Sequence, residues 1–229
     1  MNARRLIALG MGLAIAGAAA RAQGVLSYYS QFPAVGLANA DWSETLDLPG
    51  FDSNLGTLTQ VTLNYSGEVL QTIDAENTAG AEASYDLASN AALAVYNAGG
   101  LCLFDPGPIN LHRAGTLSAF DGALDFAGTS GVGFQQDTRT TDSLNDPNLG
   151  AYIDAGVLHF LASATDAMAL SSGGDSVNGG STSAAVRLGV TYAFTPIPEP
   201  AAYAALLGLF VLGYVAIHRR QRCGPAAGS

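Results

Sequence analysis

Apolar and polar residues alternate most regularly near the end of the chain, over nine residues. Val186, Leu188, Val190, Tyr192 and Phe194 are apolar, and the residues between them are small or polar. Successive side chains of a β-strand point to opposite faces, so this period of two predicts a strand with one buried face. Further strands are predicted at residues 60–65, 91–96, 122–126 and 156–161.

Segments rich in Gly, Pro, Asn, Asp and Ser separate these runs, and such residues favour turns. They occupy residues 52–54, 97–100, 105–108, 146–148 and 171–183. Between the two ends of the chain, no segment keeps a helical period. Short strands at this spacing predict a mainly β fold, a single antiparallel β-sandwich of jelly-roll type over residues 23–195.

The first 22 residues have the three zones of a secretory signal peptide. Arg4 and Arg5 give a positive start, and residues 6–20 are almost entirely apolar. Ala20 and Ala22 then supply the small-x-small pattern at which signal peptidase cuts. We therefore expect export. The alternative is an uncleaved N-terminal anchor, although the apolar run is shorter than the roughly 20 residues of a spanning helix.

The C-terminus carries a second signal made of three parts. Pro198-Glu199-Pro200 is stiff and extended, because Pro fixes φ and disfavours helix in the residue before it. Residues 201–217 are uncharged and largely apolar, so the sequence predicts a transmembrane helix at the lower limit of length. The third part is a basic tail at residues 218–222 with Arg219, Arg220 and Arg222. Because positive residues stay in the cytoplasm, Pro-Glu-Pro is predicted to lie outside.

This order of parts closely resembles the PEP-CTERM sorting signal of exosortase substrates, and the resemblance covers residues 197–222. It implies that a membrane-embedded enzyme of cysteine transpeptidase type recognises Pro198-Glu199-Pro200 and cleaves nearby. The helix would stay behind while the protein passes to the outer surface or to an exopolysaccharide matrix of a Gram-negative bacterium. The alternative is a plain C-terminal membrane anchor.

A second resemblance lies between the two signals. Residues 51–63, which follow Trp42 and Leu48, are similar to the opening signature of the choice-of-anchor E domain, and residues 190–196 are similar to its closing strand. The resemblance spans residues 27–196 and implies a β-rich surface module without assigned catalytic residues. Independently of the family, an Asp four residues before a Gly predicts a turn at Asp52, with Phe51 and Leu55 packed beneath it.

Charge is distributed unevenly along the 229 residues. Residues 23–198 contain 18 acidic residues and three Arg, which gives this part a net charge of −15. Such a surface repels nucleic acid and anionic lipid headgroups, so we expect no nucleic-acid partner. It is typical of a solvated extracellular domain.

Residue types that carry catalysis are sparse in the exported part. His112, His159 and Cys102 lie far apart, and none of the common hydrolase, P-loop or Cys-x-x-Cys motifs occurs. The sequence therefore predicts no catalytic residues and no enzyme. Cys102 lies in an apolar run and is predicted to be a small buried hydrophobic residue.

The acidic residues between positions 137 and 146 are the candidates for binding a metal ion. Asp137, Asp142 and Asp146, with Asn145, are predicted to lie in a polar loop, and these are residue types that coordinate Ca²⁺. Their spacing lacks the Gly and the distal Glu of an EF-hand. The sequence therefore predicts no metal and no other cofactor, with Ca²⁺ as the alternative.

Together these features predict an exported, exosortase-sorted cell-surface or extracellular-matrix protein of structural or interaction type. Its expected partners are signal peptidase and the secretion machinery, exosortase, the membrane through residues 201–217, and extracellular polysaccharide. Two other classes stay open. A carbohydrate-binding sandwich needs several exposed aromatic rings on one face, and the exported part has a single Trp, Trp42. A polysaccharide-active enzyme needs two carboxylates about 5–10 Å apart.

Overall fold

The computed structural model describes residues 23–197 and 200–222, and most of these residues lie in β-strands. The strands are β1 (Gly24–Phe32), β2 (Ala38–Asn39), β3 (Trp42–Pro49), β4 (Gly56–Asn77), β5 (Ala83–Asn97), β6 (Cys102–Phe104), β7 (Ile109–Leu117), β8 (Gly131–Asp146), β9 (Val157–Ser172) and β10 (Ser176–Pro196). Two short 3₁₀ turns, η1 (Ser53–Leu55) and η2 (Leu149–Ala151), and one helix, α2 (Pro200–Arg222), complete the described elements. The predicted mainly β class is confirmed.

The described residues fall into two compact units. The larger unit comprises Gly24–Ser53 and Leu58–Phe194 and contains nearly all of the strand residues. The smaller unit holds Asn54–Thr57 together with the described residues from 195 onward, which include α2. Within the smaller unit, the backbone N–H of Ile197 donates to the carbonyl of Leu55 at 3.3 Å.

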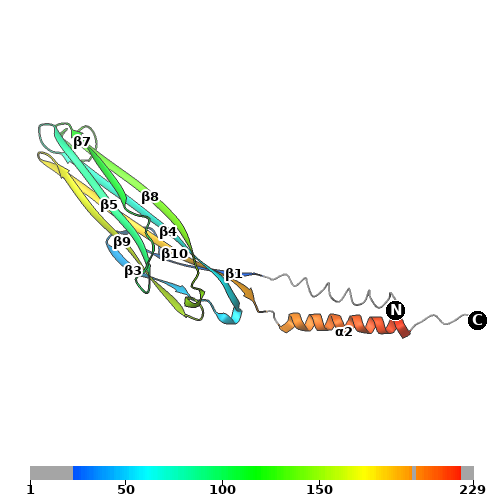
Figure 1. The fold of residues 1–229 in the computed structure, drawn as a ribbon. Coiled ribbons are helices and arrows are strands. Elements are labelled where there is room, and N and C mark those ends of the chain that lie inside the picture. The colour runs from blue at the N-terminus through cyan, green and yellow to red at the C-terminus, as the bar shows by residue number, and fades with distance from the viewer. Residues whose placement is uncertain (1–22, 198–199, 223–229) are drawn as a thin grey trace, which may run out of the picture. The chain divides into compact units, whose positions relative to one another are not determined.

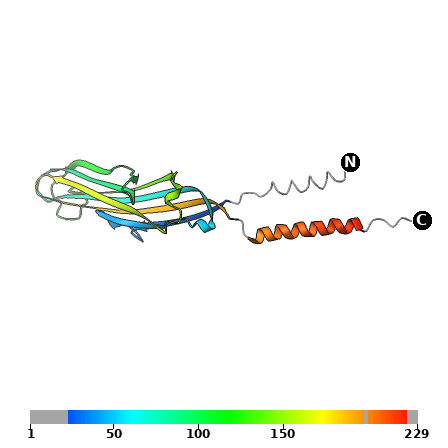
Figure 2. The same cartoon turned by 60° about the horizontal axis from the view of Figure 1, so that its bottom comes forward.

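Two antiparallel sheets build the larger unit, as Figures 1 and 2 show. One sheet has the strand order β1-β10-β4-β8, with β2 also paired to β10. The other has the order β3-β9-β5-β6, with β7 also paired to β5. A long ladder joins β4 to β8, from Val61 opposite Asp146 to Glu76 opposite Gly131. These two facing sheets confirm the predicted β-sandwich-like architecture.

Alternation along β10 builds one side of the core, as the sequence pattern predicts. Val186, Leu188, Val190, Tyr192 and Phe194 are all buried. They pack with inward residues of the opposite sheet in one apolar cluster, and burial of this kind is the main driving force of folding. The hydroxyl of Tyr192 also donates to the carbonyl of Pro49 at 2.8 Å, which ties β10 to the end of β3.

A second, smaller apolar cluster lies farther along β4, beyond Gln71. Its buried members are Ile73, Ala75, Leu87, Leu111 and Leu117. The side chain of Gln71 is fully buried between the two clusters, and its Nε2 donates to the carbonyl and the hydroxyl of Ser89 at 3.0 and 2.8 Å. These bonds satisfy the amide nitrogen and tie β4 to β5, whereas the buried Oε1 of Gln71 has no hydrogen-bond partner among the described residues.

The predicted strand at residues 122–126 is wrong, because these residues form an irregular connection between β7 and β8. The carboxylate of Asp121 accepts from the N–H of Ala123, and that of Asp125 accepts from the N–H of Ala127. Such local side-chain bonds compete with strand pairing. Phe126 has a φ of 55°, which also breaks an extended backbone.

The predicted turn region at residues 171–183 is also wrong over most of its length. Its ends belong to β9 and β10, and only residues 173–175 form the connection. Gly and Ser are poor strand formers by propensity, but long pairing with a neighbouring strand overrides that preference. The turns predicted at residues 97–100 and 146–148 are confirmed as breaks between strands, although Asn97 and Asp146 themselves end β5 and β8. At the turn after Asp52, Phe51 is buried as expected, but Leu55 is 43% exposed.

Helix α2 covers the segment for which a helix was predicted. Among the residues that the structure describes, no helix is long and apolar enough to cross a membrane. The spanning character predicted for residues 201–217 is therefore not supported.

Candidate functional site

Half of the residues predicted to direct sorting lie outside the described part of the chain. These are Ala20 and Ala22 of the signal peptide and Pro198 and Glu199 of the Pro-Glu-Pro motif. Pro200 is the first residue of α2, and Arg219, Arg220 and Arg222 belong to its last turns. The sorting motif therefore stays a prediction.

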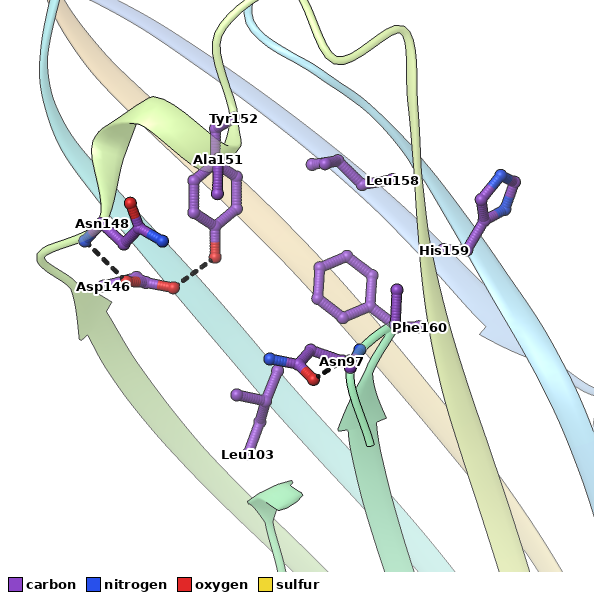
Figure 3. Close-up of a pocket in the computed structure, with 11 residues that line it drawn as sticks. Asn97, Leu103, Asp146, Asn148, Ala151, Tyr152, Leu158, His159 and Phe160 are labelled. Carbon is purple, nitrogen blue, oxygen red and sulfur yellow. Dashed lines mark hydrogen bonds between the residues drawn. The ribbon is translucent and has the colours of Figure 1, made fainter. Parts of the chain in front are cut away.

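A pocket of about 220 Å³ opens at one end of the sandwich, where β5 and β8 end and β9 begins (Figure 3). The side chains that define it are Asn97, Leu103, Asp146, Tyr152, Leu158 and Phe160. They come from five different segments of the larger unit. The lining of the pocket therefore combines polar side chains with apolar ones.

Asn97 places an amide donor at the pocket. Its Oδ1 accepts from the backbone N–H groups of Gly99 and Leu101, both at 3.0 Å. These bonds arise because the chain turns sharply after β5, and Asn is a residue that closes such turns with its side chain. With Oδ1 fixed, the Nδ2 group points into the pocket in Figure 3. No hydrogen bond joins this Nδ2 to another described residue.

Asp146 places a fixed carboxylate opposite this amide. Its Oδ1 accepts from the N–H of Asn148 at 2.8 Å, and its Oδ2 accepts from the hydroxyl of Tyr152 at 2.7 Å. Burial, followed by the bond to Asp146 and its charge, raises the pKa of Tyr152 well above its ordinary value. The phenol therefore stays a neutral donor near neutral pH. Each carboxylate oxygen keeps lone pairs for a further donor.

Apolar side chains form the walls of the pocket. Phe160 and Tyr152 are buried, and Leu103 and Leu158 are partly buried. His159 alternates to the outer face of β9, where its Nδ1 lies 2.7 Å from Oδ1 of Asp47, and both side chains are exposed. Figure 3 shows its imidazole turned away from the other lining residues.

A shallower hollow of about 350 Å³ adjoins the pocket on the outer side of the same turn. It shares Asn97, Ala98, His159 and Phe160 with the pocket and adds Thr45, Tyr96 and Leu161. Together the two hollows form a surface that is larger than a ligand with a single ring needs. Neither is lined by Arg, and the chain contains no Lys.

Tyr152 is held in place by the segment that follows β3. The N–H of Phe51 donates to the carbonyl of Tyr152 at 2.8 Å, and the N–H of Asp154 donates to the carbonyl of Phe51 at 2.8 Å. Asp154 also accepts from the N–H and the hydroxyl of Ser53, at 2.9 and 2.7 Å. These contacts hold the η2–β9 connection against the segment that follows β3.

Ser53→Ala is expected to raise the pKa of Asp154 toward its ordinary value of 3.8. The pKa is lowered by the backbone N–H of Ser53 first and by its hydroxyl second, and the substitution removes only the hydroxyl. A lowered pKa means that the contact stabilises the fold above about pH 3.8 and loses that effect as the pH falls through the folded value. An NMR titration of the Asp154 carboxyl carbon measures the shift, and an unchanged pKa would contradict the assignment.

Cys102 is exposed, which corrects the prediction of a buried residue. Its partner strand changes register there: Val95 faces Phe104, but the next residue, Tyr96, faces Cys102. Two steps along β6 thus match one step along β5. A bulge of this kind breaks the alternation of faces, so Phe104 is buried and Cys102 is not.

The acidic residues considered for Ca²⁺ lie on a strand, which corrects the expectation of a loop. Asp137, Asp142 and Asp146 all belong to β8. Asp137 and Asp142 differ by an odd number of positions and point to opposite faces, while Asp142 and Asp146 are four residues, about 13 Å, apart. They cannot share one ion. The described residues contain no group of three or more His, Cys, Asp or Glu that could hold a metal.

Aromatic residues in the larger unit do not form a row on one sheet face. The exposed ones that the structure describes there are Tyr28, Tyr29 and Phe120. Tyr28 and Tyr29 are neighbours on β1 and point to opposite faces, and the guanidinium of Arg187 covers one side of the Tyr29 ring at 3.9 Å. A flat aromatic platform for a glycan is therefore not found in this unit.

Sequence reasoning did not identify the pocket as a site. It placed the turns at residues 97–100 and 146–148 correctly, but it gave no reason to bring them together. Asn97 and Asp146 meet because β5 and β8, on different sheets, both end at the same end of the sandwich. No local signal in the sequence carries that information.

Comparisons with known proteins show no family for this chain. No protein-family model matches it, and no curated protein does. Among solved structures, dimeric latent PorU from Porphyromonas gingivalis is 11% identical, with a TM-score of 0.26 over 76% of this chain and 13% of its own. A structure of the infectious bursal disease virus Gx strain is 12% identical, with a TM-score of 0.23 over 78% of this chain and 37% of its own. The chain thus spans well under half of either matched chain, and likenesses at these scores do not bear on function.

Proposed function

We propose that this chain is an exported, exosortase-sorted bacterial protein of the cell surface or extracellular matrix, with a structural or interaction role rather than a catalytic one. The C-terminal segment is its sorting signal, and the β-sandwich is the part that is delivered. The proposal includes removal of the signal peptide after Ala22 and recognition of Pro198-Glu199-Pro200 by the sorting enzyme.

The observation that supports it most is the exposed apolar surface of α2. Large apolar side chains on all sides of the helix are between 47% and 67% exposed; they are Leu207, Leu209, Phe210, Val211, Leu212, Tyr214 and Val215. A helix that is apolar on every side is normally buried in a protein core or in lipid. None of these side chains belongs to the apolar clusters of the described residues. We infer that α2 contacts the membrane while the protein is sorted.

The distribution of charge also supports the proposal that the C-terminal segment is a sorting signal. Arg219 is exposed at the end of α2, and the basic residues of the tail follow one another there. Such residues stay on the cytoplasmic side, whereas the acidic sandwich carries the charge of a soluble, self-repelling surface domain. An acidic domain followed by a basic C-terminal tail fits a chain that is held at the membrane by its C-terminal segment and then released.

Fractionation of the native host tests this proposal. Antibody against the sandwich should detect the chain on the cell surface or in the surrounding matrix, with only a minor, larger form in the inner membrane. The secretion route can be checked by the loss of residues 1–22 from the detected protein. Detection of the protein solely in the cytoplasm, with residues 1–22 retained, would contradict the proposal.

A further inference from the structure

We infer that the pocket formed by Asn97, Leu103, Asp146, Tyr152, Leu158 and Phe160 binds a neutral sugar unit, with the adjoining hollow accepting the next unit of a glycan chain. This goes beyond the proposed function by naming a ligand class for the sandwich. It does not depend on how the chain is sorted, because the pocket lies wholly within the larger unit.

The first step of the argument is the hydrogen-bonding set. Asn97 offers a donor, Nδ2, whose direction is set by the two backbone bonds to its Oδ1. Asp146 offers acceptor lone pairs on a carboxylate held by Asn148 and Tyr152. A hydroxyl group both donates and accepts, so a ligand with several hydroxyls can satisfy both groups at once. Side chains already fixed by the protein lose little freedom when a ligand binds.

The second step is the apolar part of the wall. Leu103, Leu158 and Phe160 face the same space as these polar groups. A sugar ring carries hydroxyls around its edge and C–H groups on its faces, so it matches a wall that is polar on one side and apolar on the other. Binding sites for small molecules commonly combine apolar lining with a few fixed polar groups in this way.

The third step is charge. The pocket contains the carboxylate of Asp146 and no Arg, and His159, which lines both hollows, lies 2.7 Å from the carboxylate of Asp47. A carboxylated or phosphorylated sugar would meet repulsion and would find no guanidinium to bind it. The ligand class is therefore a neutral sugar rather than a uronate or a sugar phosphate.

The fourth step is size. A volume of about 220 Å³ is below the roughly 300–1,000 Å³ of pockets that enclose a drug-sized ligand, and suits one ring. The neighbouring hollow of about 350 Å³ shares four residues with the pocket, so a chain can continue across the turn after β5. A short oligosaccharide fits this arrangement better than a single free sugar.

The test uses the full chain purified in a detergent without a sugar headgroup. The probes are the neutral tetrasaccharides maltotetraose, cellotetraose and chitotetraose, with tetragalacturonate as the anionic comparison. Saturation-transfer NMR detects binding, and titration gives the Kd. At least one neutral probe is expected to bind and tetragalacturonate is not; absence of binding by all three neutral probes at millimolar concentration overturns the inference.

Asn97→Asp locates the site. Asp keeps an oxygen for the N–H groups of Gly99 and Leu101, so the turn is retained, but it replaces the Nδ2 donor by a second acceptor. The expected loss of affinity is about tenfold. Asn90→Asp makes the same change at an exposed position of the same strand and is expected to leave the Kd unchanged. Equal affinity of wild type and Asn97→Asp, with unchanged circular dichroism, overturns the assignment of the pocket.

Discussion

Leu188→Ala is expected to lower the free energy of unfolding by about 3 kcal/mol, since replacing a buried Leu by Ala typically costs 2–5 kcal/mol. Leu188 is fully buried, on the middle of β10, and belongs to the larger apolar cluster. Removing three carbons there loses the favourable free energy of burying them away from water, and it leaves a cavity between the sheets. Urea unfolding followed by the fluorescence of Trp42, the single Trp, measures the change.

Leu124→Ala is the matched control for that substitution. Leu124 is 57% exposed, in the connection between β7 and β8. The same three carbons are lost without a cavity, so the free energy of unfolding should change by less than about 0.5 kcal/mol. Equal effects of the two substitutions would show that Leu188 does not lie in the core of the folded domain.

Glu199→Ala is expected to reduce release of the protein from the membrane about tenfold or more, because the proposed sorting enzyme would lose a hydrogen bond to a charged group, which is worth about 1.5–3 kcal/mol. Glu199 is the single acidic residue of the sorting segment, between two prolines that set its backbone. Alanine removes the charge and leaves both prolines. The membrane-bound and released fractions of the native host, quantified by immunoblot, give the ratio.

Glu82→Ala serves as the control for the loss of one carboxylate. Glu82 is exposed in the connection between β4 and β5, far along the chain from the sorting segment. The Glu82→Ala protein should be released from the membrane as efficiently as the wild type. If Glu199→Ala is released as efficiently as Glu82→Ala, recognition of the Pro-Glu-Pro motif through its charge is excluded.

The sequence pattern predicted β10 well because one of its faces is buried and the other is not. Inward positions from Val186 to Phe194 are apolar, and the outward positions are small or polar, so the period of two is visible without a structure. The start of β4 was predicted for the same reason, with Val61, Leu63 and Tyr65 inward. A strand with one buried face can therefore be recognised from its own sequence, because apolar and polar residues alternate along it.

The sequence of strand β8 does not show this alternating pattern. The strand lies at the edge of its sheet, and between Val132 and Asp146 its residues are exposed or half-buried rather than buried. Thr, Gln and Asp there look like a polar loop, although the ladder to β4 holds them in an extended strand. The opposite error occurred at residues 122–126. Apolar residues there resembled a strand, but the Asp121 and Asp125 side chains bind the local backbone and prevent pairing.

The pocket could not be predicted because it depends on contacts between residues distant in sequence. Asn97, Asp146 and Phe160 come together only when the two sheets are stacked with their strand ends aligned. The direction of the Asn97 amide depends on bonds within its own turn, and the position of Tyr152 depends on the segment around Phe51. The chain contains no Lys, and no Arg lines the pocket.

The intact mass of the mature protein from its native host tests the central claim most directly. The account predicts a mass that lacks residues 1–22 and also lacks the segment beyond the Pro-Glu-Pro motif, including α2 and its basic tail. The signal peptide and the sorting helix would then both be processing elements, and the sandwich would be the functional product. A mature chain that still carries residues 201–222 would contradict sorting by cleavage and leave a domain held by its own C-terminal helix.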